Sequence, residues 1–213
     1  MKYSYIVWDF NGTLMNDVDI AVAAVNDMLL KRGMEPTYKE KYLKMVTSPI
    51  IDYYKKLFDL SIVSFDDITE EFLESYNTRL ALAGLMPGAA EALDRFDKMG
   101  MVQCVISSFE QRRLESLISY LGISQYFDEI SGAGDIRSEG KLDRGLEWLI
   151  RRHADPSEVL VIGDLVHDYE LARYMGTDCV LISAGHQHET ELKTCGVPVF
   201  KNLNDMLRSY NNG

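Results

Sequence analysis

Three aspartates lie just after short apolar, β-prone runs of the sequence. Asp9 follows the run 5–8, and Asp164 follows the run 159–162 after a single glycine, with Asp168 four residues further on. A carboxylate can act as a nucleophile, and hard carboxylate oxygens are the ligands that Mg²⁺ prefers. The pattern therefore indicates a nucleophile beside a magnesium site, provided that the fold brings these side chains together.

Two serines and a lysine supply groups that bind phosphoryl oxygens. Ser107 and Ser108 follow the apolar run 102–106, and Lys141 lies in the turn before a predicted helix. Taken alone, Ser107 is more typical of a helix cap than of a phosphate ligand. Taken alone, Lys141 is nearly as typical of a surface lysine as of a phosphate-binding one. Taken with the aspartates, however, they complete what metal-assisted phosphoryl transfer needs.

The serines also have the spacing of a helix start. Ser107 with Glu110, and Ser108 with Gln111, both match the capping-box pattern. We therefore expect a helix to begin directly behind Ser107 and to add backbone N–H donors to an anion site.

Strand-like runs alternate with helical patterns through most of the chain. This alternation predicts an α/β fold with a Rossmann-like parallel sheet covered by helices on both faces, and it places ligands at the carboxyl ends of the strands. The expected strands are 5–8, 102–106, 127–130, 159–162, 179–182 and 197–200, and the expected helices are 88–99, 109–121, 142–153, 168–175 and one from 204.

Residues 15–86 interrupt this alternation with helical patterns alone and no convincing strand. We expect helices over 17–32, 38–46, 49–58 and 65–82. The sequence therefore predicts a helical cap, 15–86, inserted after the first strand of a core made of 1–14 and 87–213. Hinges are expected near 15–17 and 84–88.

Composition describes an acidic globular protein. Of 213 residues, 46% are hydrophobic and 26% are charged, and the formal net charge is −11. Such a charge disfavours non-specific binding to nucleic acid or to an anionic membrane. We expect a small phosphorylated metabolite as the binding partner, no nucleic acid, no membrane, and a monomer or homodimer.

The three cysteines, Cys104, Cys179 and Cys195, have no CxxC or metal-ligand spacing. This sparse use suits free thiols in a reducing compartment. The first residues do not read as a signal peptide, and no apolar run has membrane length. A cytoplasmic location is therefore expected.

The motifs, in this order, resemble those of the haloacid dehalogenase superfamily. The resemblance is carried by the segment 9–14 (Asp-Phe-Asn-Gly-Thr-Leu), by Ser107, by Lys141 and by the segment 163–168 (Gly-Asp-x-x-x-Asp). The helical insertion and the segment 85–88 (Leu-Met-Pro-Gly) are similar to the branch of phosphoglycolate phosphatase and β-phosphoglucomutase. A single motif is weak evidence, but four in order are strong evidence.

The resemblance implies an Mg²⁺-dependent phosphatase in which Asp9 attacks phosphorus and forms an aspartyl-phosphate. Asp9, the backbone carbonyl of Asn11, Asp164 and, directly or indirectly, Asp168 are then the metal ligands. Gly12 permits a sharp turn, and Thr13 ties the loop down. The implied phosphate-binding set is Asn11, Gly12, Thr13, Ser107, Ser108 and Lys141.

Asn11 departs from the family's phosphatases, which carry an aspartate there as general acid and base. An amide cannot transfer a proton at neutral pH, and general acid–base catalysis is typically worth about 10²–10⁴ in rate. The sequence leaves open a weak phosphatase, a mutase-like phosphotransferase, a phosphate-ester binding or regulatory protein, or a substitution made to trap a complex. A haloacid dehalogenase activity fits less well, because that branch resembles Asp-x-Tyr at this motif.

The remaining histidines and the tyrosines of the insertion have weaker signals. His167 reads as a turn residue without a role. His186 and His188 read as part of a polar surface loop, which we favour over a transition-metal site. Four tyrosines at helical spacing are expected to pack between cap and core rather than to bind substrate: Tyr38, Tyr42, Tyr53 and Tyr54.

Overall fold

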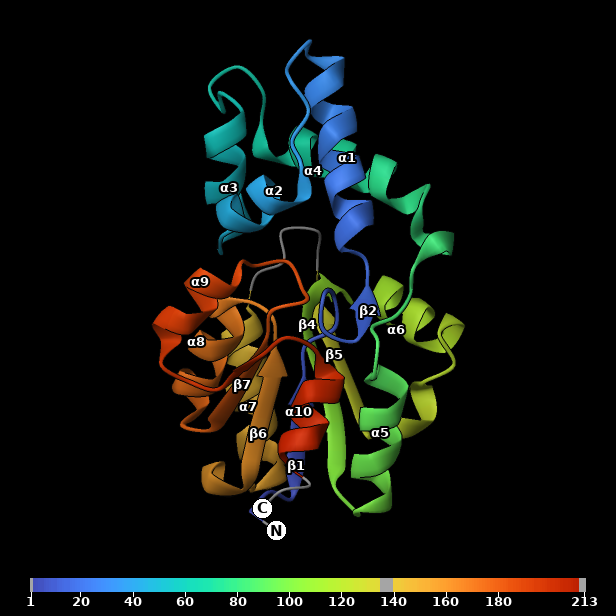
Figure 1. Ribbon diagram of the computed structural model, residues 1–213, viewed down its shortest axis with the longest axis vertical. Helices are drawn as coiled ribbons and strands as arrows, with labels where there is room; N and C mark the ends of the chain where they lie inside the picture. Colours follow the sequence, from blue (N-terminus) through green and yellow to red (C-terminus); the bar gives the residue numbers. More distant parts are fainter. Residues whose placement is uncertain (1, 135–139, 211–213) are drawn as a thin grey trace.

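A six-stranded parallel sheet organises the chain in a computed structural model, which describes residues 2–134 and 140–210 (Figure 1). The strand order is β5-β4-β1-β6-β7-β8, and every neighbouring pair is parallel. The α/β, Rossmann-like class predicted from the sequence is confirmed. The strands are β1 (Tyr5–Trp8), β4 (Val102–Glu110), β5 (Glu129–Ala133), β6 (Val159–Gly163), β7 (Asp178–Ile182) and β8 (Val199–Phe200).

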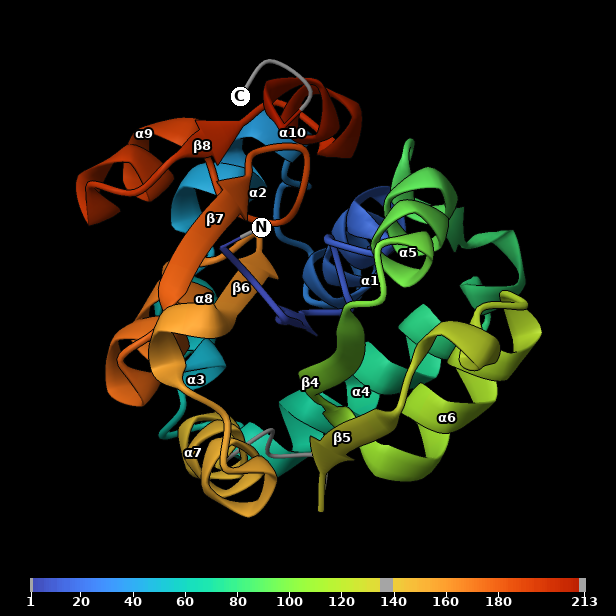
Figure 2. The same cartoon turned by 90° about the horizontal axis from the view of Figure 1, so that it is seen from below.

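Helices cover both faces of this sheet (Figure 2). Alternate residues of β1 point to opposite faces: Val7 belongs to the cluster beneath α7 (Lys141–Arg152) and α8 (Val166–Met175), whereas Trp8 packs against Phe96 on the other face. Burial on both faces explains why the central strands are apolar at nearly every position. The second face is covered by α5 (Ala89–Lys98), α6 (Gln111–Tyr120) and α10 (Leu203–Ser209).

Four further helices form a layer beyond the carboxyl ends of the strands, as Figure 1 shows. Since β1 is one of the two central strands, the residue that follows it faces this layer from near the middle of the sheet edge. The buried core is continuous from the sheet into the layer through Phe10, Leu14 and Met15. The layer consists of α1 (Val18–Lys31), α2 (Lys39–Met45), α3 (Ile50–Leu57) and α4 (Phe65–Asn77).

Two short strands connect the sheet to the helical layer. β2 (Met15–Asn16) pairs antiparallel with β3 (Gly84–Leu85), and Met86 N donates to Leu14 O at 2.8 Å. The expectation of no strand in 15–86 is therefore wrong at its two ends. The reason is that the segment entering the helical layer and the segment leaving it run side by side, and their backbone N–H and C=O groups hydrogen-bond to each other.

Two helix boundaries also differ from the prediction. The helix expected over 65–82 ends at Asn77, and a separate 3-10 turn, η1, covers Leu80–Leu82. The expected capping boxes at Ser107 and Ser108 are wrong, because β4 continues to Glu110. The Glu110 carboxylate itself caps α6, accepting from Arg112 N at 3.0 Å and Arg113 N at 3.1 Å.

The other predicted elements are present, with ends that shift by a few residues. No helix within the described residues has both the length and the apolar character that crossing a membrane requires. The remaining short elements are η2 (Ser124–Tyr126), η3 (Pro156–Glu158), α9 (Glu189–Leu192) and η4 (Lys193–Cys195).

Candidate active site

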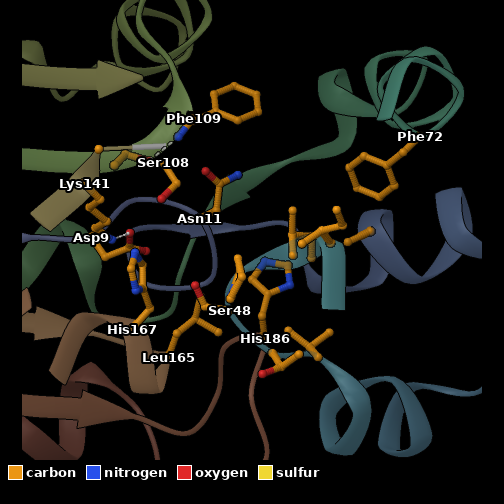
Figure 3. A pocket seen from close by; sticks show the side chains of 18 of the residues that line it. Asp9, Asn11, Ser48, Phe72, Ser108, Phe109, Lys141, Leu165, His167 and His186 are labelled. Carbon is orange, nitrogen blue, oxygen red and sulfur yellow. Dashed lines mark hydrogen bonds and ion pairs between the residues drawn. The ribbon is translucent and has the colours of Figure 1, made fainter. Parts of the chain in front are cut away.

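The three aspartates and the lysine singled out in the sequence meet at the carboxyl edge of the sheet. Lys141 Nζ lies 2.5 Å from Asp9 Oδ1 and 2.6 Å from Asp168 Oδ1. Carboxylate oxygens of Asp9, Asp164 and Asp168 all lie within 4.8 Å of one another, and all three residues are buried. The fold thus joins groups that follow β1 and β6 with groups of α7 and α8 in one cluster. Figure 3 shows two of its members, Asp9 and Lys141, close together.

The loop after β1 is shaped by close contact with this cluster. Gly12 has a φ of +74°, and a Cβ there would lie 2.4 Å from Asp164 Oδ2 and 2.5 Å from His186 Cδ2. Only glycine fits such a position without strain. Thr13 Oγ1 donates to Asp164 Oδ1 at 2.8 Å, so Thr13 does tie the loop down.

Asp168 orients its neighbours. Its Oδ1 pairs with Lys141, and its Oδ2 accepts from Asp164 N and Leu165 N, each at 2.9 Å. These contacts fix the first turn of α8 and the backbone of Asp164. Asp168 therefore positions both the Lys141 ammonium group and the backbone of Asp164.

Burial and mutual repulsion disturb the charges of the cluster. Burial, together with the nearby Asp168, raises the pKa of Asp9 to about 6, against the opposing effect of Lys141. Burial and the Asp9 charge also raise the pKa of Asp164 well above its ordinary value. Burial disfavours the charged lysine, but the two carboxylates outweigh it and raise the pKa of Lys141.

This charge balance suits a divalent cation. When ionised, the three carboxylates and one ammonium leave two negative charges in a buried space. Burying unbalanced charge is costly, so a hard cation with oxygen ligands fits the donor set. The side chains present therefore match the predicted magnesium site.

Ser107 and Ser108 line a cavity above this cluster. Ser107 is 2% exposed, and its Oγ accepts from Phe109 N at 3.1 Å. Because α6 begins three residues after Ser108, no helix start lies directly behind Ser107, and the expected helical N–H donors are absent from this segment. The serines face the cavity from extended chain instead.

Asn11 belongs to a polar cluster that sequence reasoning missed. Its Nδ2 donates to Asp17 Oδ2 at 2.9 Å and to the Tyr76 hydroxyl at 3.0 Å. Tyr76 in turn donates to Asp17 Oδ2 at 2.5 Å, and Gly12 N donates to Asp17 Oδ1 at 2.8 Å. Asp17 is 2% exposed, so the amide at position 11 helps to satisfy a buried carboxylate.

His186 completes this cluster, and the expectation of a polar surface loop is wrong for it. The residue is buried, its Nε2 lies 3.0 Å from Asp17 Oδ1, and its Nδ1 lies 2.9 Å from the Tyr42 hydroxyl. Its backbone N–H donates to Asp164 Oδ2 at 2.6 Å. Burial alone disfavours the imidazolium, but the Asp17 carboxylate outweighs it and raises the pKa of His186 to about 9.

The same loop fastens the helical layer to the core. Gln187 Nε2 donates to Val46 O at 3.2 Å, and His188 N donates to Leu43 O at 3.0 Å. The side chain of His188 caps α9 and remains partly exposed. The sequence offered one indication that these residues belong to the site. Residues 186–188 follow the carboxyl end of β7, as other site residues follow the ends of their strands.

The expectations for His167 and the tyrosines have mixed outcomes. His167 lines the cavity, and its Nδ1 lies 2.9 Å from Glu170 Oε2. Tyr42, Tyr53 and Tyr54 are buried, and Tyr42 packs against His186 as expected, but Tyr42 also lines the cavity. Tyr54 contacts the rings of Phe58 and Phe65, which belong to the helical layer itself. Tyr38 is 65% exposed, so its predicted packing is wrong.

A cavity of about 870 Å³ lies between the strand ends and the helical layer (Figure 3). Asp9, Asn11 and Lys141 form part of its lining on the sheet side, and Phe72 and Val46 face it from the helical layer. A bound molecule could therefore contact the acidic cluster and the helical layer at once.

Comparison with known proteins agrees with this geometry. A family model for haloacid dehalogenase-like hydrolases matches residues 6–182. A phosphoglycolate phosphatase of Pseudomonas fluorescens is 30% identical over 86% of this chain and 70% of its own length. An N-acetylmuramic acid 6-phosphate phosphatase of Pseudomonas aeruginosa is 25% identical over 88% of this chain and 85% of its own.

Solved structures show the same fold. A haloacid dehalogenase-like family protein from Streptococcus pneumoniae has a TM-score of 0.83 at 17% identity, covering 98% of both chains. A predicted phosphoglycolate phosphatase from Haemophilus somnus has a TM-score of 0.80 at 16% identity, covering 99% of both chains.

Proposed function

The chain belongs to the haloacid dehalogenase-like hydrolase family, in the branch similar to phosphoglycolate phosphatases, and we propose that it hydrolyses small phosphate monoesters with Mg²⁺. The observation that carries the proposal is the Asp9 carboxylate. It follows β1, pairs with Lys141 and faces a cavity from within an acidic cluster. Relatives named as phosphatases support the same reaction class.

Asp9, Asp164 and the backbone carbonyl of Asn11 would hold the magnesium ion. When bound, the ion neutralises charge on the phosphoryl oxygens and helps to orient the ester. Asp168 keeps Lys141 and the backbone of Asp164 in place through the contacts described above.

Asp9 supplies the nucleophile in the first step. A carboxylate oxygen forms a bond to phosphorus, the ester P–O bond breaks, and the alcohol oxygen leaves with that electron pair. Lys141 Nζ, 2.5 Å from Asp9, stabilises the negative charge shared between nucleophile and phosphoryl group. Ser107 and Ser108 offer hydroxyl donors to the phosphoryl oxygens from the cavity wall.

Water completes the reaction in the second step. A water oxygen bonds to phosphorus, the bond to Asp9 breaks, and inorganic phosphate is released with the carboxylate restored. Both steps need proton transfer, which the Asn11 amide cannot perform. Water must therefore protonate the leaving alcohol unless another cavity group does so, and we expect slow turnover with poor leaving groups.

The helical layer is proposed to act as a cap over the site. It is joined to the core by the paired strands β2 and β3 and by the loop at 186–188, which contacts α2. A cap that closes over the cavity would exclude bulk water and macromolecules alike. This arrangement favours a small phosphorylated metabolite as substrate.

A second candidate function rests on Asn11 itself. Because an amide does not transfer protons at neutral pH, position 11 lacks the acid and base that hydrolysis of an aspartyl-phosphate uses, and its Nδ2 is in addition bound to Asp17 and Tyr76. A phosphate-ester binding protein would tolerate that loss. A phosphotransferase would lose less of its aspartyl-phosphate to water, but another group would have to take the proton of the acceptor alcohol.

Steady-state hydrolysis of a panel of phosphomonoesters with Mg²⁺ tests the proposal. The protein is assayed beside Asp9→Asn and Asn11→Asp. Turnover above the Asp9→Asn background, with a preference among esters, supports a phosphatase. Activity in Asn11→Asp alone favours the second candidate, and activity in none of the three contradicts both the phosphatase and its residue assignments.

A further inference from the structure

The cavity has two chemically different ends. Near Asp9 it is polar and charged, as a phosphoryl group requires. Away from Asp9 the helical layer contributes mainly apolar side chains to the lining. The apolar and aromatic lining on this side comprises Ala21, Val46, Ile50, Ile51, Phe65, Phe72 and Tyr76.

Positive charge is scarce in this lining and is already engaged. Within residues 2–134 and 140–210, Lys141 is the single lysine or arginine that lines the cavity. It is held between two carboxylates. The lining histidines also have acidic neighbours: His186 lies 3.0 Å from Asp17, and His167 lies 2.9 Å from Glu170.

Negative charge, by contrast, extends along the lining. Asp143 in the first turn of α7 lines the cavity, in addition to Asp9 and Asp17. A carboxylate on the organic part of an ester would therefore be brought into an apolar region with acidic neighbours. Burying such a charge without a partner is unfavourable.

Aromatic rings form a continuous wall from α4 to the end of β4. Phe72 and Tyr76 are stacked with centroids 5.3 Å apart, and Tyr76 meets Phe109 edge to face at 6.2 Å. In Figure 3 the Phe109 ring lies above Asn11 and the Phe72 ring lies to its right. Such a wall gives a flat apolar group a large area of contact.

The size of the cavity points the same way. Its volume of about 870 Å³ lies near the top of the roughly 300–1,000 Å³ typical of pockets for drug-sized ligands. Phosphoglycolate, whose organic part is a two-carbon acid, would leave most of the apolar lining without a partner.

We infer that the substrate's organic group is bulky and apolar. The inference rests on the proposed phosphatase function and deepens it. It separates this chain's substrate class from the substrate in the name of its phosphoglycolate phosphatase relatives. The specificity-determining residues are those of the apolar and aromatic lining, among them Phe72 and Ile51.

A set of esters with similar leaving alcohols tests the inference: 4-methylbenzyl phosphate, 4-carboxybenzyl phosphate, ethyl phosphate and phosphoglycolate, each with Mg²⁺. We expect kcat/KM for the methylbenzyl ester to exceed that of each carboxylated ester by at least about tenfold, because burying the carboxylate without a cation is unfavourable. Equal or better use of the carboxylated esters would overturn the inference. Failure to hydrolyse any ester above the Asp9→Asn background would instead overturn the proposed function.

Three variants check that the cavity wall sets the preference. Phe72→Ala should lower kcat/KM for methylbenzyl phosphate several-fold more than for ethyl phosphate, mainly through KM. Ile51→Arg should raise the use of carboxybenzyl phosphate relative to methylbenzyl phosphate by about tenfold or more, since it adds a cation to the wall. Ile62→Arg is the matched control, because Ile62 is 83% exposed and outside the cavity lining, and it should leave that ratio unchanged. A ratio that none of the wall variants moves would contradict the assignment.

Discussion

Replacing Asn11 with aspartate restores the family's usual residue, yet the structure predicts that it destabilises this protein at neutral pH. The half-buried Asn11 amide donates to Oδ2 of the buried Asp17 at 2.9 Å. An aspartate at position 11 would present an acceptor to that carboxylate. Two ionised carboxylates at this separation repel by about 6 kcal/mol for an effective dielectric constant of 20.

Keeping the new aspartate protonated is less unfavourable than placing two ionised carboxylates side by side. At pH 7 it costs about 4 kcal/mol, from an unperturbed pKa of about 3.9 and about 1.4 kcal/mol per pH unit. The protonated acid then donates to Asp17 much as the amide did, so the hydrogen bond itself is roughly conserved. We therefore expect Asn11→Asp to lower the free energy of unfolding by about 4 kcal/mol at pH 7.

The pH dependence follows from the raised pKa of the new carboxyl group. The folded state retains a proton that the unfolded state has lost, so stability relative to the parent protein falls as pH rises above about 4. The deficit should shrink by about 1.4 kcal/mol for each pH unit from 7 down to about 4, where it disappears.

Urea unfolding in metal-free buffer between pH 4 and pH 7 measures this effect. The control is the same substitution in an Asp17→Asn background, where the new carboxylate faces an amide and the deficit should fall below about 1 kcal/mol. A deficit that is independent of pH, or that persists unchanged in the Asp17→Asn background, would refute the reasoning.

Three further outcomes are expected. Lys141→Met should lower kcat/KM at least about a hundredfold, because it removes the cation beside the nucleophile, and hydrolysis assays at saturating Mg²⁺ check this. Gly12→Ala should lower the free energy of unfolding by about 1–3 kcal/mol in urea titrations, since its φ is +74° and the new Cβ would meet Asp164. Glu71→Gln should lower it by about 1 kcal/mol at pH 7, through loss of the two-point pair with Arg32. Because that pair lowers the pKa of Glu71, the difference should vanish in the same titrations as pH falls below about 4.

The sheet and the acidic cluster were predictable because both depend on local patterns and one general rule. Apolar runs marked the strands, and the carboxyl ends of parallel strands lie on one edge. That rule is sufficient to bring together Asp9, Lys141, Asp164 and Asp168 from distant parts of the chain.

The cluster around Asn11 could not be predicted in the same way. Asp17, Tyr76 and His186 come from the start of α1, from α4 and from the loop after β7, and no local spacing relates them. Their association depends on how the helical layer docks, which is a tertiary property. The local sequence around His186 does not distinguish a buried histidine paired with a carboxylate from a histidine in a surface loop.

The start of α6 shows a different kind of failure. Ser107 and Ser108 had suitable capping spacing, but Glu110 was equally able to accept the first N–H groups of the helix. Pairing of β4 with β5, which reaches Glu110, decided between them. Local preference offered several caps, and the sheet determined which one was used.

The central claim is that Asp9 carries the phosphoryl group. Acid quenching of the protein during turnover of a phosphomonoester with Mg²⁺, followed by borohydride reduction and peptide mass spectrometry, tests it most directly. Intact mass should first exclude deamidation of the Asn11-Gly12 pair. The account predicts reduction of residue 9 to homoserine in the parent protein, no reduction there when ester is omitted, and loss of hydrolysis in Asp9→Asn. Hydrolysis that continues without modification of Asp9, or that survives in Asp9→Asn, would contradict the account.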